Sequence, residues 1–306
     1  MTCLSGGIHA SYDFGERAQV ARISRFVSMD RLSSNYSGLS PFQFSGNRPI
    51  DSYDHQGNEI ILTSKTNAET GKAQIKICIT GKIIFDDKLK LTDSQKSKYI
   101  NNLNDKLSEV YSKVFDNMEV VMDSKLELGT EAILKPEDHA VYVGNLHAGS
   151  GTSGVPDNVG GFVSSIGGKK AFFPKSLDLS TAANEVGHLL GLFHPKDLAK
   201  AVSERPFFVE GNAVTFEYDE IFKMFSPDNV MHHSDDTHLA GGRRNNFDSI
   251  QAQMIVVAQH YGVLNQGSNL KIGTVSDEYK AASKSSSARQ MGAMFVGVFQ
   301  EIAKSK

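Results

Sequence analysis

The sequence predicts an α+β protein, with one domain of mixed strands and helices that follows a small, irregular β segment. Three observations lead to this class. Ile75, Ile77 and Ile79 alternate with polar residues, as in a half-buried strand. Residues 93–116 and 247–262 instead repeat apolar residues at helical spacing. The first sixty residues have few periodic apolar runs and are rich in Ser, Gly, Asn, Asp and aromatic residues.

Composition excludes several classes of protein. The chain has 306 residues, 40% of them hydrophobic and 22% charged, which is typical of a globular protein of one or two domains. A net charge of -3 gives no reason to expect nucleic-acid binding. Two cysteines, Cys3 and Cys78, are too few for a cysteine-rich zinc site or a disulfide framework. No apolar run reaches the roughly 20 residues of a membrane helix, and we expect neither a membrane span nor a secretory signal peptide.

Four segments follow from changes in composition. Residues 1–62 form the aromatic and polar segment, and residues 63–73, TSKTNAETGKA, are predicted to be a linker because small polar residues bury little surface. Residues 74–265 carry the periodic elements of the main domain. Residues 266–306 are expected to be a Ser/Lys spacer and a short helix that packs back on the domain.

Within the main domain, a strand at 74–85 precedes the first helix, which Thr92 and Gln95 begin with a capping-box pattern. Further strands are predicted at 118–128, 139–148 and 160–168, with a Gly/Ser/Asn/Pro loop between the last two. A second strong helix at 247–262 has Asn246 as a candidate cap and Gly262 at its end.

A motif with metal-binding chemistry lies between the last strand and that helix, in TAANEVGHLLGLFHPKD, residues 181–197. Asn184 and His188 stand at i and i+4, which places both on one face of a helix. Glu185 stands beside the first of them, where it could take a proton from a metal-bound water. Beyond a glycine turn, His194 returns toward the same place. Histidine nitrogens at such spacing favour zinc.

The string N-E-x-x-H-x-x-G-x-x-H resembles the H-E-x-x-H-x-x-G-x-x-H signature of the metzincin zinc metalloproteases, with Asn184 in place of the first histidine. That family also carries a methionine turn beneath the metal, and Met231 in SPDNVMHHSDD resembles it. Some subfamilies have a tyrosine two residues after the methionine. His233 stands there in this chain, and three roles stay open for it: metal ligand, oxyanion donor, or polar surface.

The metzincin resemblance covers roughly residues 74–265 and implies a mixed, twisted sheet with two to three long helices. It implies one zinc ion on His188 and His194, with Asn184 at the third position. Glu185 would be the general base and then the acid of an endopeptidase. The strand at 160–168 would bind an extended peptide by strand addition.

Asn184 weakens the implied metal site, because an amide oxygen is a hard, weak donor for zinc. Three explanations stay open. The asparagine is an engineered inactivation, or the protein is a natural pseudoprotease that binds an extended peptide or partner protein without cleaving it. Alternatively, another group such as His233 supplies the third ligand.

The first segment resembles a second family, the end of the Rhs/YD-repeat core. The resemblance rests on five strings in one order: YDFGER (12–17), RFVSMDRL (25–32), LSPF (39–42), NRPI (47–50) and DHQG (54–57). In that family a β-shell encloses a toxin encoded directly after it.

The Rhs resemblance makes the main domain a candidate toxin of a polymorphic toxin system. It implies secretion or injection into a target cell by a non-classical route. It also implies a protein or peptide substrate, and a cognate immunity protein or delivery apparatus as partners. Asp30 and Asp54 stand where the family's aspartates cut the chain, but Arg31 and His55 replace the neighbouring prolines. Autoprocessing at these aspartates and a simple turn role both stay open, as does the possibility that the chain is only a shell fragment.

Overall fold

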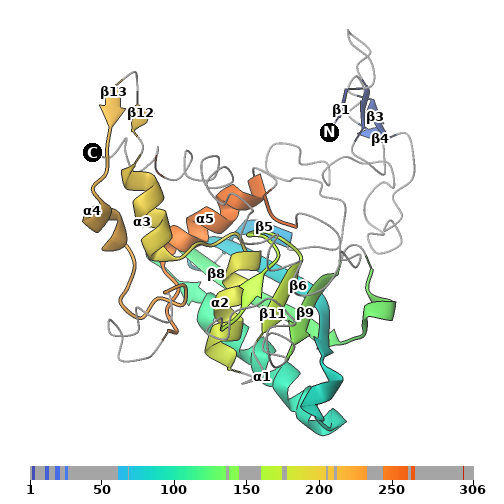
Figure 1. The fold of residues 1–306 in the computed structure, drawn as a ribbon. Helices are drawn as coiled ribbons and strands as arrows, with labels where there is room; N and C mark the ends of the chain where they lie inside the picture. Colours follow the sequence, from blue (N-terminus) through green and yellow to red (C-terminus); the bar gives the residue numbers. More distant parts are fainter. Residues whose placement is uncertain are drawn as a thin grey trace. The chain divides into compact units, whose positions relative to one another are not determined.

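The computed structural model describes residues 2–3, 11–13, 18–20, 25–26, 61–67, 69–135, 138–144, 160–173, 178–204, 206–209, 212–232, 244–260, 263–265 and 299 (Figure 1). The chain divides into two compact units, Met1–Asn58 and Glu59–Lys306. Among the described residues, no helix is both long and apolar enough to cross a membrane.

The first unit contains a small antiparallel sheet with the strand order β1-β2-β3-β4. Its strands are β1 (Thr2–Cys3), β2 (Ser11–Asp13), β3 (Ala18–Val20) and β4 (Arg25–Phe26). These short strands agree with the small β segment expected there. Asp30 and Asp54 lie outside the described residues.

The second unit is built on one mixed sheet with the order β10-β11-β9-β6-β8-β7, and β5 pairs with β6. Its central strands β8, β6, β9 and β11 are parallel, whereas β10, β7 and β5 are antiparallel to their neighbours. Together with the helices this confirms the α+β class. The strands are β5 (Ile61–Thr66), β6 (Ala73–Phe85), β7 (Lys113–Val114), β8 (Met118–Leu128), β9 (His139–Val143), β10 (Phe162–Val163) and β11 (Lys170–Phe173).

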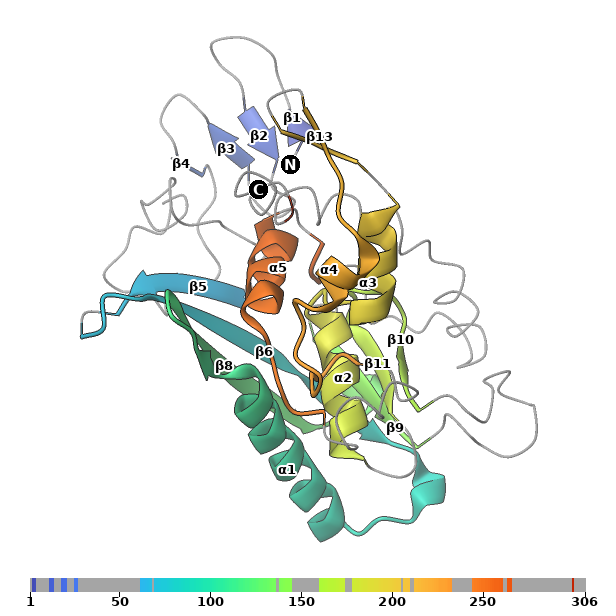
Figure 2. The same ribbon diagram turned by 90° about the vertical axis from the view of Figure 1, so that its left-hand side faces the viewer.

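The helices of this unit cover one face of the sheet. Helix α1 packs on β8, α2 packs on β11, and α1 and α2 contact each other (Figure 2). The helices are α1 (Asp93–Tyr111), α2 (Leu179–Leu189), α3 (Pro195–Ser203), α4 (Tyr218–Phe222) and α5 (Ser249–His260). The shorter elements are the 3-10 turns η4 (Asp87–Leu89) and η5 (Glu131–Ile133), and the hairpin of β12 (Phe207–Val209) and β13 (Asn212–Val214).

Helix α1 begins as predicted, because the Thr92 hydroxyl accepts the Gln95 main-chain N–H at 3.3 Å and the Gln95 side chain accepts that of Thr92 at 2.8 Å. It ends at Tyr111, before the predicted residue 116. The next residues pair with β8 as strand β7, and this sheet pairing replaces the last predicted turn of helix.

The predicted linker at 63–73 is wrong. Residues 61–66 form β5, which pairs antiparallel with the first half of β6, so the polar stretch is a hairpin of the main sheet. Glu119 of β8 holds this hairpin, since it accepts hydrogen bonds from Asn67, Thr70 and Gln74 at 2.9 to 3.1 Å. The stretch is polar because it lies at the surface, while the main chain of residues 63–66 pairs with β6 in the sheet.

The core lies between the sheet and its helices. Along β6, Ile77, Ile79 and Ile83 are buried against the helices, while Lys76 and Lys82 lie on the opposite face. Each fully buried side chain of this size contributes about 1.5–3 kcal/mol. Of residues 266–306 only Phe299 is described. Its buried ring contacts Phe216 at a centroid distance of 5.6 Å.

Candidate metal centre

Helix α2 carries the motif into the interior. Asp178 caps its first turn, because the Asp178 carboxylate accepts the Thr181 main-chain N–H at 2.8 Å. One turn later, Asn184, Glu185 and His188 are 4%, 6% and 8% exposed. Buried polar groups destabilise a fold unless they are hydrogen-bonded, so their partners define what this site is built to hold.

A sharp turn ends the helix and brings the second histidine back. Gly191 has a φ of 84°, in the left-handed region that favours glycine, and its N–H donates to the His188 carbonyl at 3.0 Å. The chain then places His194 as the residue before α3, with Pro195 at the first helical position. The predicted glycine turn is confirmed.

The rings of His188 and His194 lie together, with centroids 4.6 Å apart and planes at 88°. Each Nδ1 lies against a main-chain carbonyl oxygen: that of Leu192 at 2.8 Å for His188, and that of Met231 at 2.6 Å for His194. A carbonyl only accepts, so each Nδ1 carries the hydrogen, and in the neutral form of such a ring the lone pair is on Nε2. This arrangement is the one that orients metal-binding histidines in proteins.

Asn184 makes the corresponding hydrogen bond with its amide. Its Nδ2 donates to the carbonyl oxygen of Val230 at 2.9 Å. In asparagine Nδ2 is attached to Cγ, as Nδ1 is in histidine, so it occupies the place of a ring N–H. No asparagine atom reaches the place of Nε2, and position 184 therefore offers no nitrogen ligand.

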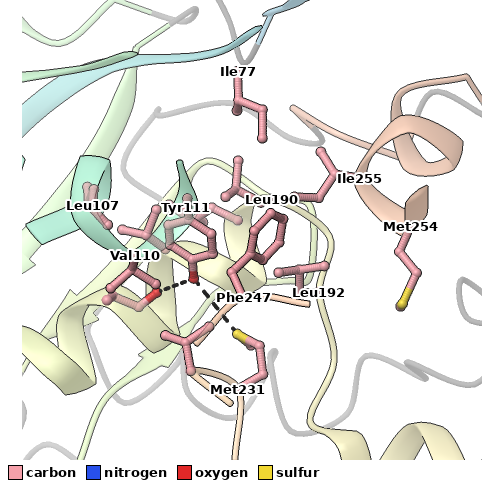
Figure 3. Packing of buried hydrophobic residues seen from close by; sticks show 14 of the residues in the cluster. Ile77, Leu107, Val110, Tyr111, Leu190, Leu192, Met231, Phe247, Met254 and Ile255 are labelled. Atoms are coloured by element: carbon pink, nitrogen blue, oxygen red, sulfur yellow. Dashed lines mark hydrogen bonds between the residues drawn. The ribbon is translucent and has the colours of Figure 1, made fainter. Parts of the chain in front are cut away.

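Met231 lies beneath α2 and is fully buried. A Cβ on Gly187 would come within 2.2 Å of the Met231 Sδ atom and 2.5 Å of the Tyr111 hydroxyl, so only glycine fits there. Tyr111 of α1 donates to the Ala183 carbonyl at 2.7 Å and lies 4.0 Å from the same sulfur (Figure 3). The sequence analysis identified Met231 as a site residue, but it identified neither Tyr111 nor Gly187. A glycine in the middle of a predicted helix was the one signal that could have pointed to Gly187.

The side chain of Glu185 lies between its own helix, α2, and the edge of the sheet. Its Oε2 is buried and makes no hydrogen bond with any described residue. Burial raises its pKa to about 8, and the Arg244 guanidinium offsets part of that rise. A Cβ on Gly161, next to edge strand β10, would lie 2.8 Å from the Glu185 Cγ, so the strand passes directly over this side chain.

The donor set fits zinc only in part. Two imidazoles with their lone pairs on Nε2 are suitable, and Glu185 has an unpartnered buried oxygen, but Asn184 adds no nitrogen. Within the described part of the chain there is no group of three or more His, Cys, Asp or Glu side chains that could hold a metal ion. His233 lies outside the described residues.

Comparisons with known proteins identify no family for this chain. No family model matches the chain, and no curated protein matches it. One solved structure, described as "Structure of a chaperone-substrate complex", has 13% sequence identity and a TM-score of 0.34. The match covers 67% of this chain and 38% of the length of that one. A TM-score of this size does not indicate a shared fold.

Proposed function

We propose that residues 74–265 form a zinc-dependent endopeptidase domain of metzincin type, impaired in this chain by Asn184. One observation carries the proposal. The side chains at 184, 188 and 194 each place an N–H against a main-chain carbonyl, at 2.6 to 2.9 Å. The position held by asparagine thus has the orienting partner of a histidine and lacks only the metal-binding nitrogen.

In this proposal His188 and His194 hold the ion, and a histidine at 184 completes the set. Zinc supplies a Lewis acid and a polarised water when it is bound. Glu185, next to position 184 on α2, would be the residue placed to accept a proton from that water and to pass it to the leaving amine. The lack of a described partner for its Oε2 atom supports this role.

The substrate in this proposal is an extended peptide that lies along β10. That strand is an antiparallel edge of the sheet and pairs, among the described strands, with β11 alone. An edge strand presents main-chain N–H and C=O groups that an extended peptide can pair with. Gly161 brings this edge against Glu185, so a peptide on β10 would pass next to the proposed general base.

A pseudoprotease that binds a peptide without cleaving it is the alternative. It is favoured by the way Asn184 fits the fold, because this side chain is 4% exposed and hydrogen-bonded to the Val230 carbonyl. Strand β10 does not require a histidine at 184, so peptide binding on this edge does not depend on the metal.

The Rhs resemblance of the first segment supports a toxin setting for this domain, with delivery into a target cell and an immunity protein as partner. The expected consequence is toxicity of the full chain once Asn184→His is introduced. Growth of cells that express this variant from an inducible promoter should stop, whereas the present chain and Asn184→His with Glu185→Gln should be tolerated. Normal growth with Asn184→His would argue against a toxic protease in those cells.

Zinc content is the direct test. We expect Asn184→His to retain about one zinc ion per chain after desalting and the present chain to retain little, measured by elemental analysis. Asn184→His combined with His194→Ala is the control and should lose the metal again. If Asn184→His holds no zinc, the endopeptidase proposal fails. If it holds zinc but cleaves no member of a peptide library, the pseudoprotease is favoured.

A further inference from the structure

A polar network next to the candidate metal centre joins residues 229–232, called here the Met231 segment, to the start of α5. At its centre Asn229 is fully buried. Its Nδ2 donates to Gln251 Oε1 at 2.8 Å and also to the Asp248 carboxylate, and its Oδ1 accepts Gln251 Nε2 at 3.1 Å. Side chains at the start of α5 thus bind both the nitrogen and the oxygen of the Asn229 amide, which fixes the orientation of that amide.

Asn229 holds two successive peptide groups of the Met231 segment. Its side-chain Oδ1 accepts the Met231 N–H at 2.8 Å, and its main-chain carbonyl accepts the His232 N–H at 3.1 Å. In a trans peptide the N–H and C=O groups point in opposite directions. Fixing the two N–H groups therefore also fixes the carbonyls of Val230 and Met231.

Those two carbonyls are the ones that face the candidate metal centre. Val230 accepts from Asn184, and Met231 accepts from the His194 ring. The line of contacts runs from helix α5 through Asn229 and two peptide planes to two of the three ligand positions. The third, His188, uses the Leu192 carbonyl of its own turn and does not depend on Asn229.

We propose that Asn229, held by Asp248 and Gln251, is a positioning residue of this centre that orients the side chains at 184 and 194 through the Val230 and Met231 carbonyls. The orientation of His194 is a property of the chain as it stands. The consequence for zinc affinity rests on the function proposed above. The two parts are therefore tested separately.

The first test reads the tautomer of each histidine by ¹⁵N–¹H long-range NMR of the full chain. The present chain should show Nδ1–H for both His188 and His194. Asn229→Ala should populate both tautomers of His194 and leave His188 unchanged. Because the truncation leaves buried polar groups unpaired and threatens folding, Gln251→Met is the second variant. It removes the hydrogen bonds of Gln251 to Asn229 and to the Asp248 main-chain N–H, conserves volume, and should produce a smaller shift of the same kind.

The matched control is Asn104→Ala. Asn104 is also an amide that joins a helix to main-chain groups, since it bonds the N–H and the C=O of Leu126 at 3.1 and 2.9 Å. It lies between α1 and β8, and its loss should destabilise the fold without changing either histidine. The proposal is overturned if His194 keeps Nδ1–H in both Asn229→Ala and Gln251→Met. A change of His188 as large as that of His194 would equally overturn it, because it would indicate general loosening.

The second test measures zinc affinity in the Asn184→His background by competition with a chelating dye. Adding Asn229→Ala should weaken binding at least about 10-fold, as loss of an outer partner of a ligand does, whereas adding Asn104→Ala should not. Equal affinities in the two double variants would overturn the positioning role. If Asn184→His alone binds no zinc, the proposed function fails, and the tautomer measurement still decides the role of Asn229.

Discussion

The Nδ1 atom of His194 lies 2.6 Å from the carbonyl oxygen of Met231, a residue 37 positions later in the chain. The two parts of the candidate site that the sequence singled out are therefore joined directly, by a hydrogen bond from a side chain to the main chain. Met231 acts on the site twice, through this carbonyl and through a sulfur that packs under Gly187.

Zinc should stabilise the chain only when position 184 is histidine. A ligand that binds the folded state alone adds about 4 kcal/mol when its concentration is 1,000 times the dissociation constant. We expect Asn184→His to lose several degrees of melting temperature after treatment with EDTA and to recover them with zinc, by differential scanning fluorimetry. The present chain should be insensitive to EDTA, and a comparable loss in it would mean that the metal binds without residue 184.

Gly187→Ala should destabilise the protein. The new methyl group would meet the Met231 sulfur at 2.2 Å and the Tyr111 hydroxyl at 2.5 Å, and overpacking of this kind costs about 1–3 kcal/mol. Alanine gains up to about 1 kcal/mol in helix propensity, which offsets only part of this. Urea unfolding should show a net loss of about 1 kcal/mol or more. A melting temperature equal to or above that of the unchanged chain would contradict the packing of Met231 under α2.

Gly161→Ala should act on Glu185, and its neighbour Gly160 provides the control. The Cβ at 161 would lie 2.8 Å from the Glu185 Cγ, whereas the nearest described atom to a Cβ at 160 is a Thr181 methyl at 3.6 Å. In the Asn184→His background we expect Gly161→Ala to lower kcat/KM at least about 10-fold while zinc content is kept, and Gly160→Ala to leave both unchanged. Equal activities of the two variants would remove Gly161 from the site.

Stability should fall at mildly acidic pH because of His139. Burial lowers the pKa of this ring to about 4 from 6.5, opposed in part by a hydrogen bond to the Thr80 carbonyl at 3.1 Å. Between these two values the unfolded chain binds the proton and the folded chain does not, so stability is full above about pH 6.5 and falls as the pH approaches 4. The linkage amounts to roughly 2 kcal/mol between pH 7 and pH 5.

The measurement for His139 compares urea unfolding at pH 7 and pH 5 for the chain and for His139→Gln. The variant should lose roughly 2 kcal/mol less over this interval, because its side chain does not titrate. Carboxylates titrate in both proteins, so the difference between the two isolates the histidine. Parallel losses would show that the buried ring is not the source of the acid sensitivity.

Local pattern determined several elements of this protein. Helix α1 begins at its capping box, β8 runs from Met118 to Leu128 as predicted, and Gly191 ends the motif helix. The spacing of positions 184 and 188 placed both residues on one buried helix face. These features depend on hydrogen bonds and side-chain contacts between residues a few positions apart, so they are present in the order of the amino acids.

Contacts between distant residues decided the rest. Strands β5 and β11 were not predicted from their own residues, and they form because they pair with the neighbouring strands β6 and β9. The candidate site likewise depends on the carbonyls of Val230 and Met231 and on the Asn229 amide that fixes them. Main-chain carbonyls are the same in every residue and leave no mark in a sequence. The histidines could therefore be found from sequence spacing, but the groups that orient them emerge only when the chain is folded.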